Sequence, residues 1–233
     1  MSVKRVALVG DNTAAIVDYF KALRETILPK FGLDIVLDEV FTPPLPDATG
    51  VVQKLREARP DVAINGATAH SDAVTLLQKM REFSVKVPML GLGAQFTTRE
   101  FRDGVGAEII DGLMATVASH TLKGQEELAK RFQERTGEPW MTQDTVSGYA
   151  ELWIVKEALE KAASTDPTKL RDALAALDLR QGPAARALLP GHIRFNEQGR
   201  RVDAVPVIVQ WQSGVPYTVY PTEGAVRQAV WPK

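Results

Sequence analysis

Short apolar runs separated by amphipathic segments make up the first half of the chain. Five of these runs predict strands: residues 6–9, 33–41, 61–65, 87–91 and a segment within 109–117. Residues 6–9 are apolar throughout, which is typical of a strand buried on both faces of a sheet. Since helical patterns separate the strands, crossover connections and a mostly parallel sheet are expected.

The pattern changes between His120 and Leu189. We predict three helices and no strand here: residues 125–135, residues 145–163 and a third helix that begins at Asp166 and Pro167. Aspartate before a first-turn proline is typical of a helix start. The middle helix has a broad apolar face that must pack against another element. The sequence predicts no second sheet that could pack there.

The last part of the chain returns to β-structure. Residues 191–195 predict a strand, residues 196–199 a turn, and Ser213-Gly214 the turn of a hairpin. The predicted fold is therefore an α/β protein with an open, mostly parallel sheet, flanking helices, the helices of a second lobe and a C-terminal β-hairpin return.

Composition narrows the classes of function. The 233 residues are 45% hydrophobic and 24% charged, which is ordinary for a globular protein. A net charge of −1 with mixed signs argues against nucleic acid or an anionic membrane as a partner. The absence of cysteine excludes disulfides and thiolate chemistry.

Motifs for catalysis and metal binding are missing from the sequence. His70, His120 and His192 lack metal-ligand spacing, and no serine lies in a nucleophile elbow. We therefore expect no enzyme activity, no metal and no cofactor. No apolar stretch approaches the ~20 residues of a membrane span. The N-terminus lacks the apolar segment of a signal peptide, so the sequence as written predicts a cytoplasmic protein.

Three loops follow strands and are candidates for ligand binding, because open parallel sheets bind ligands beyond the carboxyl ends of their strands. The loop at residues 10–13 offers Asp11, Asn12 and Thr13 at a helix N-terminus, which favours an anion. The alternative is that Asn12 or Thr13 only caps the helix.

The other two loops each have a structural alternative. Residues 66–71 offer Thr68 and His70, although a single histidine after a strand is more often a cap or a surface residue. In residues 91–97, Gly93 lets backbone approach a ligand and Gln95 can form hydrogen bonds. Glycine there is equally explained by a loop that needs a positive φ.

Several sequence segments together resemble one known family: residues 54–61, 77–91, 110–113, 132–137, 148–162, 170–174 and 191–200. In order and spacing they resemble the C-terminal two-thirds of a periplasmic solute-binding protein. The type is the Leu/Ile/Val-binding (type I) family, which serves ABC importers of branched-chain amino acids and related small acids or amides.

The resemblance implies a domain organisation. Residues 1–118 would be the α/β core of the second lobe, 119–187 helices of the first lobe, and 188–233 the return to the second lobe. The N-terminal α/β unit of the first lobe would be missing. The apolar face of residues 145–163 would then fold onto the second-lobe core, pair in a homodimer, or belong to a longer chain.

The resemblance also implies a site and partners. Ligand contacts would lie near Asn12 or Thr13, Ala69 or His70, and Gly93 or Ala94. No acidic partner for an ammonium group stands at residues 93–95, which keeps small carboxylates and amides open beside amino acids.

The family's partner is a membrane ABC permease, and its location is the periplasm. Two alternatives stay open: a cytoplasmic ligand-sensing module of the same fold, and a Rossmann-like enzyme.

Overall fold

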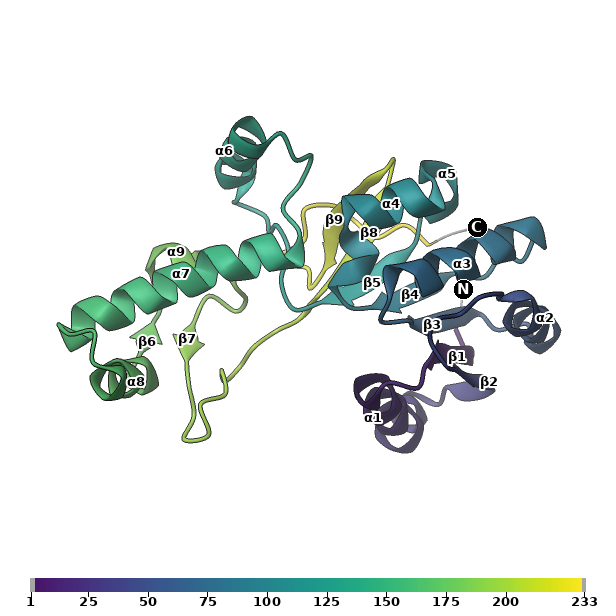
Figure 1. Cartoon of the computed structure of the whole chain (residues 1–233), viewed down its shortest axis with the longest axis horizontal. Coiled ribbons are helices and arrows are strands. Elements are labelled where there is room, and N and C mark those ends of the chain that lie inside the picture. Colours follow the sequence, from purple (N-terminus) through teal and green to yellow (C-terminus); the bar gives the residue numbers. More distant parts are fainter. Residues whose placement is uncertain (1–2, 232–233) are drawn as a thin grey trace. The chain divides into compact units, whose positions relative to one another are not determined.

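The computed structural model describes residues 3–231, which divide into two compact units (Figure 1). Unit 1 extends to Thr116 and also includes Val209–Pro216 and the end of the chain from Ala229. Unit 2 consists of Val117–Ile208 and Tyr217–Gln228. The chain therefore passes repeatedly from one unit to the other, as an interleaved protein does.

Strands and helices alternate through unit 1. In chain order they are β1 (Arg5–Asp11), α1 (Ala14–Ala22), η1 (Leu23–Ile27), η2 (Leu28–Phe31), β2 (Asp34–Phe41), α2 (Thr49–Ala58), β3 (Val62–Gly66), α3 (His70–Glu82), β4 (Met89–Leu92), η3 (Ala94–Thr97), α4 (Arg99–Val105), α5 (Ala107–Ile110) and β5 (Met114–Val117). All five predicted strands are present. The mostly parallel α/β class predicted from the sequence is confirmed.

The sheet has seven strands in the order β2-β1-β3-β4-β5-β8-β9. Parallel pairing joins β1 to β2, β1 to β3, β3 to β4, and β4 to β5. The chain therefore moves from β1 to β2 on one side and then crosses to β3 on the other. This reversal makes the carboxyl ends of β1 and β3 a topological switch point, the place where open α/β sheets bind ligands.

Two glycines on neighbouring strands allow α1 to pack closely on the sheet. A Cβ atom added at Gly10 or at Gly66 would lie 2.8 Å from the side chain of Ile16. Phe20 is fully buried in the same core cluster with Leu8. The glycines therefore hold the start of α1 directly against the carboxyl ends of β1 and β3.

The predicted C-terminal hairpin is confirmed as β8 (Val207–Gln212) and β9 (Val215–Tyr220). Its two turn residues, Ser213 and Gly214, have φ values of 55° and 77°. Positive φ at both positions is the backbone of a type I′ turn, whose twist matches that of paired strands.

Unit 2 is mainly helical, with α6 (Glu126–Thr136), α7 (Gln143–Ala162), α8 (Pro167–Ala175), β6 (Asp178–Leu179), α9 (Gly182–Ala187) and β7 (Ile193–Arg194). The three predicted helices are confirmed. The carboxylate of Asp166 accepts hydrogen bonds from the backbone N–H groups of Thr168 and Lys169, both at 3.0 Å, which confirms the predicted cap of α8.

The prediction of no strand between His120 and Leu189 is wrong, and α9 was not predicted. β6 pairs antiparallel with β7, with Leu179 opposite Ile193. Two residues are too few to show the alternation that identifies a strand. In α9 the buried residues are alanines, which give a weak amphipathic signal.

One face of α7 is buried within unit 2 and another is exposed. Ile154 and Ala158 pack in a core cluster with Ala173 of α8 and Ala184 of α9. Leu152, by contrast, is 74% exposed, as is typical of a helix that lacks part of its cover. Over residues 3–231, no helix is both long and apolar enough to cross a membrane.

Candidate functional site

The candidate site lies at the carboxyl ends of β1, β3 and β4 in unit 1, and it includes every residue predicted from the sequence. These residues are Asp11, Asn12, Thr13, Thr68, Ala69, His70, Gly93 and Gln95. Parallel pairing of the strands brings the three loops to the same edge of the sheet.

Asp11 ends β1, and its fully buried carboxylate connects the first two loops. Its Oδ1 atom accepts hydrogen bonds from the N–H group (3.0 Å) and the hydroxyl (2.5 Å) of Thr13. Its Oδ2 atom accepts from the N–H group (2.7 Å) and the hydroxyl (2.6 Å) of Thr68. Both carboxylate oxygens are therefore engaged within the protein.

The hydrogen bonds also determine the charge of Asp11. Burial raises the pKa of this carboxyl, but the hydrogen bonds from Thr13 and Thr68 outweigh burial and hold the pKa below its ordinary value. Asp11 is therefore an anion at neutral pH. Its geometry makes it a positioning residue for the two loops.

Two helix N-termini open onto this edge. Thr13 precedes α1 and Ala69 precedes α3, and neither residue caps its helix with a side-chain hydrogen bond. The first N–H groups of a helix have no partner within the helix, and the helix dipole makes this end attractive to anions. Backbone donors therefore face the place where a ligand carboxylate or amide oxygen would lie.

The capping alternative for the first loop is not what the structure shows for Thr13, since its hydroxyl donates to Asp11. Asn12 instead donates from Nδ2 to Thr42 Oγ1 at 3.0 Å, which connects this loop to the one after β2. The amide oxygen of Asn12 is the acceptor that this exposed side chain presents at the edge.

The loops after β3 and β4 are joined by two further hydrogen bonds. His70 Nε2 lies 3.1 Å from the hydroxyl oxygen of Thr98, which also accepts from Phe101 N–H as the cap of α4. Gln95 Nε2 donates to the carbonyl oxygens of Ala67 (2.8 Å) and Leu92 (2.9 Å). The amide nitrogen of Gln95 is thus turned into the protein.

Gly93 has a conformation that favours glycine. Its φ is 115°, and a Cβ atom there would lie 2.5 Å from Gln95 Oε1. The glycine is therefore explained by its backbone and by the inward-turned glutamine, as the structural alternative for this loop predicted.

Sequence reasoning missed three residues of this edge: Thr42, Asp72 and Thr98. Asp72 is buried, and its Oδ1 atom accepts from Leu45 N–H at 3.1 Å and from the Ser71 hydroxyl at 3.2 Å. Its Oδ2 atom has no hydrogen-bond partner within the described range. Thr98 had a detectable signal, because threonine just before a helical segment is a common cap.

The chemistry of the edge is that of hydrogen-bond recognition. The helix starts of α1 and α3, the amide oxygen of Asn12 and the imidazole of His70 border this edge. The hydroxyls of Thr13 and Thr68 donate to Asp11, and the carboxylates of Asp11 and Asp72 are turned inward. Within residues 3–231, no group of three His, Asp or Glu residues is placed to hold a metal ion. The arrangement suits a small ligand that offers oxygen acceptors.

Comparison with known proteins gives one family match. A model for the family described as periplasmic binding protein matches residues 1–215. Among curated relatives, Leu/Ile/Val-binding protein homolog 7 of Brucella suis is 26% identical over 216 residues, which is 90% of this chain and 53% of that protein. Homolog 8 of Brucella melitensis is 25% identical over 204 residues, 84% of this chain and 50% of that protein.

Solved structures share the fold at low sequence identity. A Silicibacter pomeroyi protein described as a branched-chain amino acid ABC transporter has a TM-score of 0.79 at 18% identity, over 98% of this chain and 61% of that one. A solute-binding protein from Rhodopseudomonas palustris, solved with benzoate, has a TM-score of 0.74 at 15% identity, over 99% of this chain and 61% of that one. The chain spans about half the length of the curated relatives it matches.

Proposed function

Since the chain belongs to the periplasmic binding protein family, of the type that includes branched-chain amino acid ABC transporters, we propose that it binds a small solute for such a transporter. The ligand would lie on the loops after β1, β3 and β4. The observation that carries the proposal is the buried Asp11, which holds two of these loops at the topological switch point. Enzymatic turnover is not part of the proposal.

The units support a two-lobe organisation. Unit 1 has most of the large sheet, whereas within the described range unit 2 has four helices and the two-stranded β6–β7 sheet. Residues 1–118 would form the second lobe, 119–187 would contribute helices to the first lobe, and 188–233 would return to the second. The greater length of the relatives leaves room for the remaining part of the first lobe.

Ligand binding would be coupled to lobe closure. Each lobe would supply part of the hydrogen bonds, and the ligand would shift the population toward the closed state because it binds that state more tightly. The closed form would then dock on a membrane permease in the periplasm. This docking requires the complete two-lobe protein.

The proposed ligand class is a small carboxylate or amide, with branched-chain amino acids as members of that class. Two helix N-termini, at the starts of α1 and α3, offer backbone N–H groups, which favour oxygen acceptors. Residues 93–95 contain no carboxylate for an ammonium group.

Hydrogen exchange tests the site directly. Leucine, isobutyramide and benzoate would each be titrated while exchange is followed by mass spectrometry. The proposal expects saturable protection of the amides in the first turns of α1 and α3, without consumption of the ligand. Conversion of the ligand would contradict the proposal and favour an enzyme.

A pair of variants sharpens this test. Ala69→Glu places a carboxylate at the N-terminus of α3 and should repel an anionic ligand, weakening binding about tenfold or more. Ala107→Glu, at the start of α5 outside these loops, is the matched control and should bind as the wild type does. Equal affinity of the two variants would exclude the α3 N-terminus from the site.

A cytoplasmic ligand sensor of the same fold is the second candidate. Fractionation of the source organism distinguishes the two, since a transport receptor would be found in the periplasm as a species well above 25.5 kDa.

A further inference from the structure

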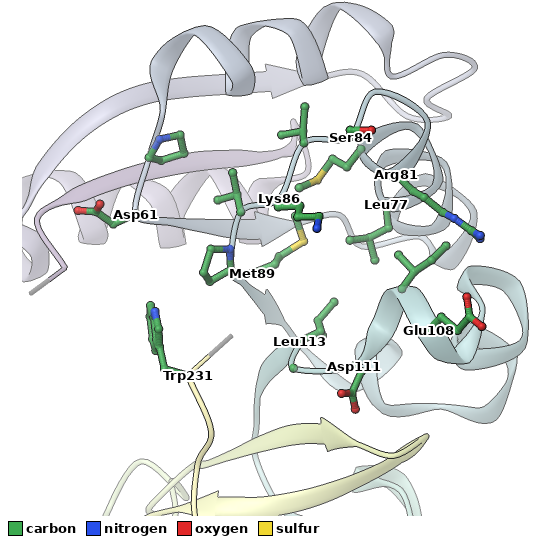
Figure 2. A pocket seen from close by; sticks show the side chains of 17 residues that line it. Asp61, Leu77, Arg81, Ser84, Lys86, Met89, Glu108, Asp111, Leu113 and Trp231 are labelled. Atoms are coloured by element: carbon green, nitrogen blue, oxygen red, sulfur yellow. The ribbon is translucent and has the colours of Figure 1, made fainter. Parts of the chain in front are cut away.

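Unit 1 has a cavity at the opposite edge of its sheet from the candidate site (Figure 2). Its lining includes Asp61, Pro88 and Leu113, which lie directly before β3, β4 and β5. Since these strands are parallel, the cavity lies at their amino ends. Its volume of about 740 Å³ is within the range of sites that bind small molecules.

The walls of the cavity are mainly apolar. The apolar lining residues include Met80, Val85, Met89, Leu113 and Trp231. Trp231 is held at the wall through its neighbour, because Val230 N–H donates to Gln210 Oε1 at 2.8 Å and Gln210 Nε2 donates to Val230 O at 2.5 Å. The side chain of Gln210 is fully buried, so this part of the wall is fixed by a buried contact.

Lys86 provides a positive charge near the centre of this lining (Figure 2). Among the residues that the structure describes, its ammonium group forms no hydrogen bond or ion pair, and the side chain is exposed to the cavity and solvent. A cation without a partner beside an apolar wall is complementary to an anion that has an apolar body.

The acidic lining residues do not neutralise Lys86. Asp61 accepts hydrogen bonds from the backbone N–H groups of Lys4 (2.8 Å) and Arg5 (2.9 Å), and its carboxylate points away from the cavity (Figure 2). Asp111 accepts from the Ser213 N–H group at 2.8 Å. Glu108 lies at the rim together with Arg81 (Figure 2).

We propose that this cavity binds a small amphipathic carboxylate. The carboxylate pairs with Lys86, and the aliphatic or aromatic body lies against Met80, Met89 and Leu113. The site is separate from the loops after β1, β3 and β4, because it lies at the other end of the same strands. It therefore does not depend on the proposed transport function.

The methionine methyl groups provide a local readout of binding. The protein labelled with ¹³C at the methionine ε-methyl groups would be titrated with octanoate, a probe with a carboxylate and an apolar chain. The proposal expects saturable shifts of the Met80 and Met89 resonances, while Met141 in unit 2 stays unchanged. Absence of saturable shifts at Met80 and Met89 up to roughly tens of millimolar octanoate, kept below micelle formation, would overturn the proposal.

Charge specificity is tested with matched ligands and variants. Octylammonium should bind at least threefold more weakly than octanoate, and Lys86→Gln should weaken octanoate about threefold, as expected for an exposed ion pair. Lys30→Gln removes another exposed lysine of unit 1 and should leave binding unchanged. Equal binding of the two ligands, or of Lys86→Gln and wild type, would overturn the role of Lys86.

The position of the site is tested by filling the cavity. Val85→Trp adds a large ring to a half-buried lining residue, and should reduce octanoate binding more than tenfold while the circular dichroism spectrum stays native. Undiminished octanoate binding by a folded Val85→Trp variant would place the ligand elsewhere and contradict the proposal.

Discussion

Unit 1 and unit 2 bury their apolar residues in different ways. In unit 1, α1 packs on β1 through large side chains such as Phe20 and Leu8, which are fully buried. In unit 2, the residues that α7 buries against α8 and α9 include several alanines, and Leu152 on another face of α7 is 74% exposed. Unit 1 thus buries large side chains of α1 against its own sheet, although Val17 and Tyr19 of α1 are partly exposed, whereas in unit 2 Leu152 of α7 lies largely in water.

The difference indicates which unit is more stable without further protein surface packed against it. Burial of a large side chain contributes about 1.5–3 kcal/mol, whereas an alanine contributes much less. We therefore expect unit 1 to be the more stable of the two, and the exposed face of α7 to be the place where further protein surface would stabilise unit 2. A homodimer is one proposed source of that cover, and the missing part of a first lobe is the other.

The largest effect is expected from removing the central ring of unit 1. Phe20→Ala should lower the free energy of unfolding by about 3–5 kcal/mol, because it leaves a cavity between α1 and β1. Urea unfolding, with hydrogen exchange to locate the change, provides the measurement. Phe31→Ala is the matched control, since Phe31 is 72% exposed and its loss should cost no more than about 0.5 kcal/mol.

The next largest effect is a loss of stability of unit 2 as the pH falls. Burial lowers the pKa of His120 from 6.5 to about 4, and its Nε2 atom has no hydrogen-bond partner within the described range. Since the unfolded chain binds the proton more readily, stability should be full above pH 6.5 and should fall as the pH drops toward 4. The loss should approach about 3 kcal/mol.

Urea unfolding measured from pH 7 to pH 4 checks this prediction, with hydrogen exchange reporting on unit 2. His120→Gln removes the titrating group and should flatten the dependence in this pH range. His70→Gln, at an exposed histidine of unit 1, is the control and should keep the wild-type slope. A wild-type slope in His120→Gln would show that another group is responsible.

A smaller effect is expected at the carboxyl edge of unit 1. Asp11→Asn replaces one acceptor oxygen by an NH₂ group that faces donors from Thr68 or Thr13, and should destabilise the protein by about 1–3 kcal/mol. Exchange should increase in the loops around these threonines. Asp34→Asn, at an exposed aspartate of β2, should leave that exchange unchanged.

Asp11 also has its own pH range. Because its pKa in the folded protein is below the ordinary value of 3.8, its contribution to stability is present above that pH and is lost as the pH falls below it. Unit 2 should therefore lose stability in mildly acidic solution through His120, and unit 1 should lose this contribution only in stronger acid. If both units lost stability together above pH 4, His120 and Asp11 would not act in the separate pH ranges predicted here.

The smallest effect is expected on the exposed face of α7. Leu152→Ser should change the unfolding free energy of the dilute protein by less than about 0.5 kcal/mol, because the side chain is already in water. Ile154→Ser, on the buried face, is the contrast and should cost several times more. A loss above 2 kcal/mol for Leu152→Ser would show that this face is covered in solution.

Sedimentation velocity then tests whether a second copy of the chain covers the exposed face of α7. A homodimer through α7 predicts that the wild-type protein associates as its concentration rises, and that Leu152→Ser weakens this association. A monomer at all concentrations would exclude the homodimer and favour the longer two-lobe chain.

The sequence predicted the five parallel strands because each is a short apolar run bounded by turn residues. The candidate loops were also found from sequence, since each directly follows a strand. What the sequence did not show is how those side chains are used: Asp11 and Gln95 had the appearance of ligand contacts, and the structure directs the carboxylate and the amide nitrogen inward. Thr68 and Ala67 are tens of residues from Asp11 and Gln95, so no local pattern in the sequence indicates these two contacts.

The same limit explains the missed elements of unit 2. β6 exists because Leu179 meets Ile193, a pairing between residues distant in sequence, and two residues cannot show a periodicity. The helices α7 and α8, by contrast, have a sustained apolar repeat or a cap at Asp166, and both signals are local.

By itself, the sequence determined the class of fold, the order of the elements and the edge of the sheet where the candidate site lies, because these follow from local periodicity and from the geometry of parallel strands. Only the tertiary structure decided that Asp11 connects two loops, that Lys86 lies beside an apolar cavity, and that Leu152 is exposed while Ile154 is buried. The physical reason is that hydrogen bonds, ion pairs and burial depend on contacts between residues distant in the chain, which a local pattern does not specify.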